Sequence, residues 1–415
     1  MGRTARDRRD APHPRPIRKV ELSEENMKRR FFLMLLFLGI GIAFIVRALL
    51  SYLSADSGWQ EISASSSELN CSEEFVFLYE LGSGDQSATA ENKALVILYS
   101  DACEKAYLLF STDTEAEDFG NLYTLNANPN EVIEVDETLY EALALVAESG
   151  DRSIYLGPAY AYYDDIFYCT DDSQTYEFDP YQNAEIAAYY AEIAAFAQDE
   201  SAVNIELLGD NQVCLSVSAD YLAYAEENGI TVFVDFFWMK NAFIIDYLAD
   251  VLTQNGYTNG CISSYDGFAR NLDERGTEFS FAVYCLDGTD ILQPAIMQYT
   301  SRRSIVYYRS YMMSDQDLIH YYEMSDGEIL TSYLDIADGL PKTARDDLIV
   351  YSDSTGCAEI LLASRAVYVS DSWDAAAALA LSENEMYVIY TEDSVVYYND
   401  AALVLDADGA SVLAE

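Results

Sequence analysis

Residues 234–246 read VDFFWMKNAFIID and join a strand-like apolar run to a helix-like one. The run ITVFVDF is rich in β-branched and aromatic residues and predicts a strand over 230–236. Beyond it the apolar residues recur at i, i+3 and i+4, so we expect a helix that ends before Gly256. The next segment, GCISSYDGFARNL, predicts a strand and then a turn at Asp266–Gly267. The predicted buried face of the helix comprises Ala242, Ile245, Leu248, Ala249 and Leu252.

Strand-like runs elsewhere in the chain cluster without strict alternation with helices, which favours a mixed α+β fold over a doubly wound sheet. We therefore predict largely antiparallel sheets with packed helices. Helical periodicity occurs at 137–149, 183–198 and 372–383. The predicted strands cover 74–81, 204–209, 212–218, 279–286, 304–312, 347–353, 366–371 and 385–391. The glycine-rich phosphate loops, the serine-hydrolase elbow and the HExxH metal motif do not occur in the sequence.

Charge is distributed very unevenly along the 415 residues, which carry a formal net charge of −48. Ten of the 23 Lys and Arg lie in residues 1–30, whereas 66 of the 71 Asp and Glu lie beyond residue 50. An acidic body of this kind repels nucleic acid and anionic lipid, so a role in binding nucleic acid is excluded. The 51% of hydrophobic residues supply enough apolar material for a folded core.

Residues 31–53, FFLMLLFLGIGIAFIVRALLSYL, are long and apolar enough to cross a bilayer and predict one transmembrane anchor. The basic tail at 1–30 places the N-terminus in the cytoplasm by the positive-inside rule. We expect a Ser-rich tether over 54–72 and one extracytoplasmic domain over 73–415. The predicted location is thus the cell membrane, with the protein attached through its N-terminal helix.

The seven cysteines are scattered without CxxC spacing, and the chain has only two histidines. This pattern nearly excludes a zinc site or a histidine-based metal site. The odd number of cysteines implies that at least one thiol is free or paired between chains. The segment RRSIVYYR, with Arg302, Arg303 and Arg309, is the one basic island in the acidic body. It either meets a pyrophosphate or balances nearby acid.

The order of segments around residues 234–267 resembles that of the ApbE-type FAD:protein FMN transferases. That family has a run close to DLGGIAKGYAVD, then a glycine-ended helix and a strand that ends in NLGG. Asp235 and Asp246 fall on the first and last aspartates of this run, eleven residues apart. The resemblance covers about residues 100–395, and its further landmarks appear in the family's order. They are Leu125–Asn126, Gly150, Gly157–Pro158, Asp335 with Gly339 and Pro341, and Glu359.

The resemblance implies a domain that binds FAD and a magnesium ion, cleaves the pyrophosphate and transfers FMN to a threonine or serine of a target protein. A hard cation with oxygen ligands would neutralise the pyrophosphate charge during this phosphoryl transfer. It also implies one cleft with Glu359 as the metal ligand. The implied cofactor-binding positions are Asp235, Asn241, Asp266, Gly267 and Asp335.

The same resemblance shows where the chain departs from the family, and these departures leave no confident catalytic residue. The family's lysine falls on Asn241, its two glycines on Phe237 and Trp238, and its metal-binding threonine on Ala363. We therefore predict a non-catalytic binding or interaction module whose partner is an extracytoplasmic protein. The alternative is an active magnesium-dependent transferase that attaches FMN to Thr or Ser of extracytoplasmic redox proteins.

Overall fold

The computed structural model describes residues 55–65, 69–393, 395–407 and 411–414. One compact unit covers 56–415. The predicted basic tail and transmembrane anchor, 1–30 and 31–53, lie outside the described residues. Within the ranges that are described, no helix combines the length and apolar character that crossing a membrane requires.

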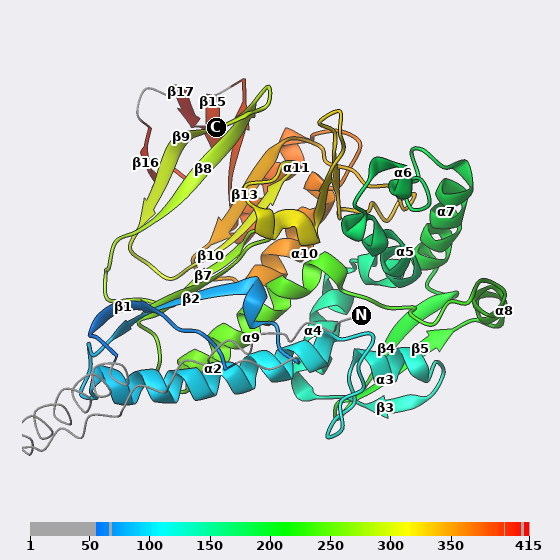
Figure 1. The fold of residues 1–415 in the computed structure, drawn as a ribbon, viewed down its shortest axis with the longest axis horizontal. Helices are drawn as coiled ribbons and strands as arrows, with labels where there is room; N and C mark the ends of the chain where they lie inside the picture. The colour runs from blue at the N-terminus through cyan, green and yellow to red at the C-terminus, as the bar shows by residue number, and fades with distance from the viewer. Residues whose placement is uncertain (1–54, 66–68, 394, 408–410, 415) are drawn as a thin grey trace, which may run out of the picture. The chain divides into compact units, whose positions relative to one another are not determined.

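A nine-stranded sheet forms the centre of this unit (Figure 1). All neighbouring strands in it are antiparallel, apart from the parallel pair β15–β17. Their order across the sheet is β1 (Gly58–Glu61), β2 (Phe75–Leu81), β6 (Gly260–Ser264), β7 (Phe268–Asn271), β10 (Arg303–Arg309), β13 (Asp347–Ser352), β14 (Tyr387–Glu392), β15 (Val395–Tyr398) and β17 (Ser411–Ala414).

Three smaller sheets accompany the central one, and all of their pairings are antiparallel. They comprise β16 (Val404–Asp406) with β9 (Asp290–Tyr299) and β8 (Phe279–Asp287), β3 (Val132–Glu134) with β5 (Gln212–Val217) and β4 (Val203–Gly209), and β11 (Tyr321–Glu323) with β12 (Ile329–Thr331). The predicted class, mixed α+β with largely antiparallel sheets, is confirmed.

The α-helices of the described residues are α2 (Ala88–Phe110), α3 (Leu122–Ala127), α4 (Glu137–Ser149), α5 (Gly157–Tyr163), α6 (Asp172–Thr175), α7 (Ala184–Gln198), α8 (Ala219–Asn228), α9 (Lys240–Gln254), α10 (Cys357–Tyr368) and α11 (Ala375–Ala380). Short 3-10 turns are η1 (Ser72–Glu74), η2 (Ser153–Leu156), η3 (Asp164–Tyr168), η4 (Phe237–Met239), η5 (Asp315–Ile319) and η6 (Leu381–Asn384).

Both faces of the central sheet are covered. Helices α2, α9 and α10 pack on strands β2, β6, β7, β10 and β13 (Figure 1). The β8–β9 hairpin contributes Val283, Ala295 and Met297 to an apolar cluster with Ile305 and Tyr307 of β10. Strand β13 is buried along its whole length. The segments that precede and follow these buried strands are therefore fixed in place, and they carry the candidate site.

Helix α9 begins and ends as its periodicity predicts. All five residues of its predicted face are buried, and Gly256 follows the end of the helix with a φ of +82°. A left-handed backbone at this position favours glycine, which has no Cβ to clash with the preceding carbonyl. The turn between β6 and β7 also lies where it is predicted, at Asp266–Gly267.

Two predicted strands are wrong. The first, over 366–371, overlaps the last turn of α10, where Tyr368 is fully buried one helical turn beyond Ser364 and Arg365. Burial of the helical face thus overrides the strand propensity of its Val and Tyr residues. The second, over 230–236, has no strand partner and is treated with the site below.

The folded unit begins within the predicted tether of 54–72, since β1 at Gly58–Glu61 pairs with β2. Trp59 packs edge-on against Phe279 with ring centroids 5.7 Å apart, and Ile62 is buried. This segment is Ser-rich, yet it contains an edge strand that is held in place by apolar contacts.

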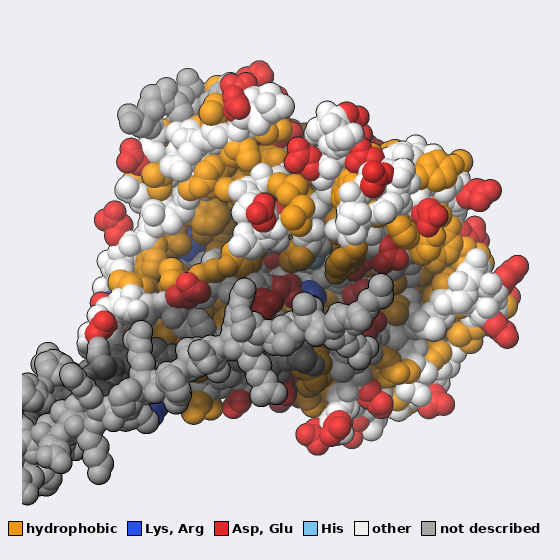
Figure 2. All heavy atoms as spheres, viewed as in Figure 1, with side chains coloured by type: hydrophobic (Ala, Val, Ile, Leu, Met, Phe, Trp, Pro, Cys, Tyr) orange, Lys and Arg blue, Asp and Glu red, His pale blue; other side chains and the backbone are white. Residues whose placement is uncertain are grey.

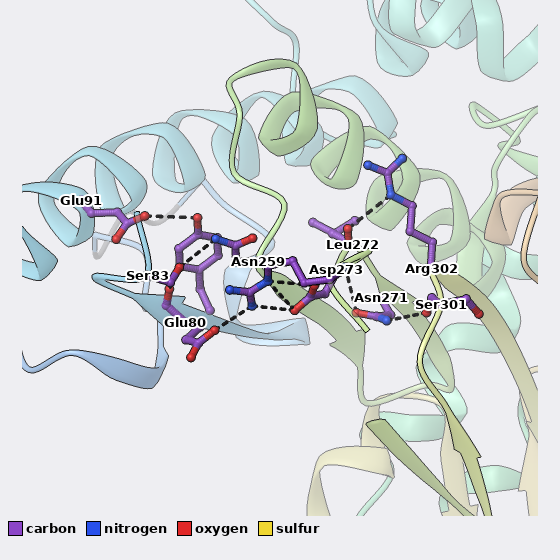
Figure 3. A network of polar contacts seen from close by, with 11 residues as sticks. Glu80, Ser83, Glu91, Asn259, Asn271, Leu272, Asp273, Ser301 and Arg302 are labelled. Atoms are coloured by element: carbon purple, nitrogen blue, oxygen red, sulfur yellow. Dashed lines mark hydrogen bonds and ion pairs between the residues drawn. The ribbon is translucent and has the colours of Figure 1, made fainter. Parts of the chain in front are cut away.

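A polar network ties the loops at one end of β2, β6 and β7 together (Figure 3). The Asn259 amide donates to the Ser83 hydroxyl (2.9 Å), and the Asn271 amide donates to the Ser301 carbonyl (2.7 Å). Arg302 donates to the Leu272 carbonyl (3.3 Å). These contacts fix the sheet on which α2 and α9 rest.

Candidate functional site

The segment before α9 is held by a side chain in place of a strand ladder. The Asn126 carbonyl oxygen accepts from the main-chain N–H of Phe233 (2.8 Å) and of Val234 (3.0 Å), and its amide donates to the Val234 carbonyl (2.8 Å). Gly157 lies so close that an added Cβ would come within 2.9 Å of Phe233 and Val234 main-chain atoms. The strand predicted here does not form because these contacts satisfy the backbone groups that a ladder would use.

Asp235 follows this clamp and starts the turn into α9. Its main-chain N–H donates to the Ile154 carbonyl, and its carboxylate accepts from the Phe237 N–H, both at 2.8 Å. Phe237 has a φ of +47°, in the left-handed region that favours glycine. A bulky residue held there costs about 1–2 kcal/mol. Its ring stacks on Tyr160 with centroids 4.9 Å apart.

Asp235 and Phe237 line a cavity of about 390 Å³. Its walls come from η1, the end of α2, η3, η4, the first turn of α9 and η5. The acidic side chains that line it are Glu74, Asp113, Asp164 and Asp235, and the basic ones are Lys240 and His320. The apolar and aromatic ones are Tyr107, Phe110, Tyr168, Phe237, Ile244 and Ile319.

Lys240 supplies the positive charge of this cavity. Its Nζ lies 3.4 Å from Glu74 Oε1. Burial would lower the pKa of Lys240, but the carboxylates of Glu74 and Asp235 raise it. Burial likewise opposes ionisation of Glu74, but Lys240 and a hydrogen bond from Asn241 outweigh it, so the pKa of Glu74 is lowered. Both groups are therefore charged at neutral pH.

Two further carboxyls of the cavity hold their protons more tightly than usual. Burial raises the pKa of Asp235 to about 6. Burial, with the charge of Asp235 nearby, also raises the pKa of Asp164 to about 6. These two groups therefore lose their protons near pH 6, about one unit below neutral pH. A cationic ligand beside them would lower their pKa.

A buried polar cluster stands behind the cavity wall. The Asn241 amide donates to Glu74 Oε2 (2.8 Å) and to Asp266 Oδ2 (2.9 Å). His320 Nε2 lies 3.7 Å from the same Asp266 oxygen. Burial lowers the pKa of His320 to about 4 and raises the pKa of Asp266 to about 6. Within the described part of the chain, both ring nitrogens of His320, Asn241 Oδ1 and Asp266 Oδ1 have no hydrogen-bond partner.

Gly267 follows Asp266 with a φ of +106°, and a Cβ there would meet the Tyr307 carbonyl oxygen at 2.2 Å. The Tyr307 N–H donates to the Gly267 carbonyl at 2.8 Å. Close packing on β10 accounts for this glycine. Its position next to Asp266 places the predicted turn at the back of the cavity wall.

Asp246, at the other end of the opening stretch, caps a different helix. Its carboxylate accepts from the first N–H groups of α10, those of Cys357 and Ala358, both at 2.9 Å. It also accepts from Arg270 NH1 at 2.6 Å. A Cβ on Gly356 would lie 2.4 Å from Asp246 Oδ2, which leaves room only for glycine. Asp246 thus neutralises the positive end of α10.

The chain is similar to solved structures of ApbE proteins. The ApbE protein of Thermotoga maritima aligns over 85% of this chain and 97% of its own, with 12% identity and a TM-score of 0.53. The flavin transferase ApbE of Vibrio cholerae aligns over 85% and 98%, with 14% identity and a TM-score of 0.55. The domain has the ApbE fold. No family model and no curated protein sequence matches the chain.

The residues that the resemblance assigns to one cleft are only partly together in this ApbE-fold domain. Asp235 lines the cavity, Asn241 and Asp266 stand behind its wall, and Gly267 adjoins Asp266. Asp335 lies outside the cavity lining: its carboxylate contacts Lys342 Nζ (3.1 Å) and accepts from the Ala337 N–H (3.0 Å). These two contacts account for Asp335 as part of the turn that ends at Gly339.

Glu359, the predicted metal ligand, is exposed in the first turn of α10 and is not among the cavity residues. Among the described residues, no three Asp, Glu, His or Cys side chains are grouped so that they could hold a metal ion. Ala363, one turn further along α10, has no oxygen to offer. The side chains present do not fit a magnesium-bound pyrophosphate, and the role of Glu359 stays a prediction.

The three arginines of the basic island are paired with carboxylates. Arg302 contacts Glu274 (2.9 Å), Arg303 contacts Asp353 (2.7 Å), and Arg309 contacts Asp317 within the core. The sequence left two roles open for these arginines, to bind a pyrophosphate or to neutralise nearby carboxylates. The contacts agree with the second role. Carboxylates dominate the charged side chains on the face shown in Figure 2.

Asp235 is the one acidic or basic side chain of the cavity that is also a predicted site residue. The others, Glu74, Asp113, Asp164, Lys240 and His320, are not among the predicted site residues. Glu74 lies in the first turn after the Ser-rich segment, and Asp164 lies in an acidic run that is typical of a solvated loop. His320 comes from η5. Only the tertiary fold brings these segments together, although an isolated histidine between apolar residues is a weak signal of burial.

Proposed function

We propose that this protein is a membrane-anchored, extracytoplasmic binding domain with the ApbE fold that does not transfer FMN. The observation that carries the proposal is Phe237. It keeps the left-handed backbone of a glycine, yet it places a ring, stacked on Tyr160, at the cavity where the resemblance would have open main chain. An aromatic ring there prevents a ligand from approaching the backbone.

The charge of the cavity supports the same proposal. The cavity is lined by four carboxyl groups, those of Glu74, Asp113, Asp164 and Asp235, and by one lysine, Lys240. His320 is neutral because burial lowers its pKa to about 4. The pyrophosphate of FAD would meet repulsion from these carboxylates. We infer that the cavity instead binds a ligand that carries an ammonium group and a hydrogen-bond donor. Asp164 and Asp235 would contact the ammonium group, and His320 would accept the hydrogen bond.

The absence of transferase activity is tested with the full chain purified in detergent. FAD and magnesium are added, unbound flavin is removed by dialysis, and a threonine-bearing acceptor peptide is analysed by mass spectrometry. The flavin transferase of Vibrio cholerae is the positive control. We expect no retained flavin absorbance and no mass increase of the peptide. Addition of FMN to the peptide would refute the proposal and establish the alternative, an active magnesium-dependent transferase.

The preference for a cation is tested with spermidine as the probe in titration calorimetry. We expect binding at pH 7.5 that weakens roughly tenfold at pH 5, where carboxyls with a pKa of about 6 are protonated. The variant D164N/D235N should show the same loss at pH 7.5. The matched control D287N/D290N removes two exposed carboxylates from the β8–β9 hairpin. Equal binding by both variants would mean that spermidine binds only to the general negative charge.

A further inference from the structure

Two cysteines that are distant in sequence meet at the edge of the cavity. Cys71 precedes η1 and lines the cavity, and Cys103 lies within α2. The Cys71 thiol lies 3.4 Å from the Cys103 carbonyl oxygen, and the Cys71 N–H donates to the same oxygen at 3.5 Å. The Cys103 side chain lies close enough to the Cys71 thiol to raise its pKa. A main-chain N–O distance of 3.5 Å between the two residues is compatible with the Cα separation of about 4.4–6.8 Å that a disulfide spans.

The other five cysteines lie on separate elements. Cys169 follows η3, and the other four lie in β5, β6, β8 and α10 as Cys214, Cys261, Cys285 and Cys357. All seven are free thiols in the structure. The pair at Cys71 and Cys103 is therefore distinguished by its mutual contact, and the odd total leaves a thiol over in any pairing within one chain.

We propose that Cys71 and Cys103 form a disulfide when the chain folds in an oxidising compartment. The oxidant is a donor disulfide, such as oxidised glutathione or a protein disulfide. The thiolate of one cysteine attacks a donor sulfur and releases one donor thiol. The thiolate of the other cysteine then attacks the mixed disulfide and releases the second donor thiol. Two cysteine thiols are oxidised and one donor disulfide is reduced.

The bond forms before the segment at Cys71 has packed against α2. Cys71 is 3% exposed and Cys103 is fully buried once the domain has folded. The nearby Cys103 side chain, together with burial, raises the pKa of the Cys71 thiol well above its ordinary value. Few thiolates exist in the folded state, so exchange there is slow in both directions. A disulfide made during folding would thus persist.

The disulfide would fix one wall of the cavity to α2. Glu74 lies three residues beyond Cys71 and carries the contacts to Lys240 and Asn241. A covalent link at Cys71 would hold this turn in position against α2. The inference rests on the extracytoplasmic location in the proposed function but not on the ligand of the cavity, and refolding in glutathione tests the bond separately from that location.

The experiment uses the full chain in detergent. Reduced, urea-unfolded protein is refolded in a mixture of oxidised and reduced glutathione. It is then unfolded again in urea that contains N-ethylmaleimide, so that buried free thiols also react, and is digested without reductant. We expect mass spectrometry to find the Cys71 and Cys103 peptides linked, and separate after reduction. Full alkylation of both cysteines, or linkage of either to another of the seven, would overturn the proposal.

The variants C71S, C103S and C71S/C103S provide the controls. Each single variant should leave the remaining cysteine of the pair open to alkylation. Oxidised wild type should melt roughly 4 °C above reduced wild type, as expected for a closed loop of this length in a domain of this size. The double variant should melt at one temperature in both conditions. If the double variant does not fold, the oxidised and reduced wild type still decide, and equal melting temperatures would contradict the proposal.

Discussion

The two aspartates that frame residues 235–246 have opposite surroundings. Asp246 accepts hydrogen bonds from two N–H groups at the start of α10 and from Arg270. Asp235 accepts from the single N–H of Phe237, lines the cavity and has a pKa raised by burial to about 6. One end of the motif is therefore saturated with structural contacts, whereas the other end keeps a carboxyl that faces open space.

The difference separates what the fold needs from what a ligand would use. A carboxylate that caps a helix and pairs with an arginine stabilises the domain in the absence of any ligand. A carboxyl with one hydrogen bond in a partly buried cavity contributes little to folding, and its ionisation is costly. Substitutions at the two ends should therefore divide into those that change stability and those that change binding.

The largest effect is expected from Asp246→Asn. The amide removes the charge that pairs with Arg270 and points an N–H group toward the donors at the start of α10. We expect the free energy of unfolding in urea to fall by about 3–4 kcal/mol. Asp235→Asn, the matched change at the other end, should alter it by less than about 1 kcal/mol. Equal losses at both ends would refute the division.

The next effect concerns the left-handed turn of the cavity wall. Phe237→Ala removes the ring and should lower the free energy of unfolding by about 3 kcal/mol. Phe237→Gly loses the same ring but also relieves the backbone, so it should cost about 1 kcal/mol less than alanine. The usual order, in which alanine is the more stable of the two, would show that the backbone at 237 is not strained.

The pH dependence of stability distinguishes His320 from the carboxyls around it. The folded pKa of His320 is lowered to about 4, so the unfolded chain binds more protons below about pH 6.5, and acidification destabilises the fold. The free energy of unfolding of His320→Asn, relative to that of wild type, should be about 2 kcal/mol higher at pH 4.5 than at pH 7.5. Urea titrations at the two pH values measure this difference. The pKa of Asp164, Asp235 and Asp266 is raised to about 6, so acidification through pH 6 stabilises the fold.

Between pH 7 and pH 5 the three carboxyls together outweigh His320, so wild type should become more stable on acidification, and the His320→Asn variant should gain more stability than wild type over the same range. A variant whose free energy of unfolding changes with pH in the same way as that of wild type would contradict the assignment. Glu74 and Lys240 keep their charge throughout this window, because their mutual contact lowers the pKa of the first and raises that of the second.

The smallest effect is expected from Glu359→Ala. The side chain is exposed in the first turn of α10, so the free energy of unfolding should change by less than about 0.5 kcal/mol. Addition of magnesium should shift the melting temperature of wild type and variant equally. A magnesium-dependent rise in wild type that the variant lacks would make Glu359 a metal ligand and weaken the case for a binding domain.

Local periodicity predicted the helices whose apolar face is regular, including α9 and its end at Gly256. It did not reveal α2, which is 23 residues long, because its apolar residues are not confined to one stripe. Ile97, for example, is 63% exposed while Leu95 is fully buried. The spacing of Asp235 and Asp246 identified the motif, but their opposite roles depend on α10 and η3, which no local pattern reports.

The cavity itself could not be predicted, since its walls come from segments as distant as Glu74 and His320. The failed strand over 230–236 has a similar cause. Its Val and Phe residues have strand propensity, yet the Asn126 side chain accepts the hydrogen bonds of the Phe233 and Val234 N–H groups that a strand partner would otherwise take. Asn126 and Gly157 were recognised as landmarks in the sequence, but their shared purpose, to hold this segment, emerges only in three dimensions.

The Asn126 clamp also determines the register of the segment that leads into the cavity. A strand in a ladder can slip by two residues and recover its hydrogen bonds. This segment cannot, because its partner is one amide group 108 residues away in sequence, with a glycine pressed against a single point of the main chain. Asp235 and Phe237 therefore have fixed positions at the cavity. A shift in register cannot place the Phe237 ring where the Asp235 carboxyl lies.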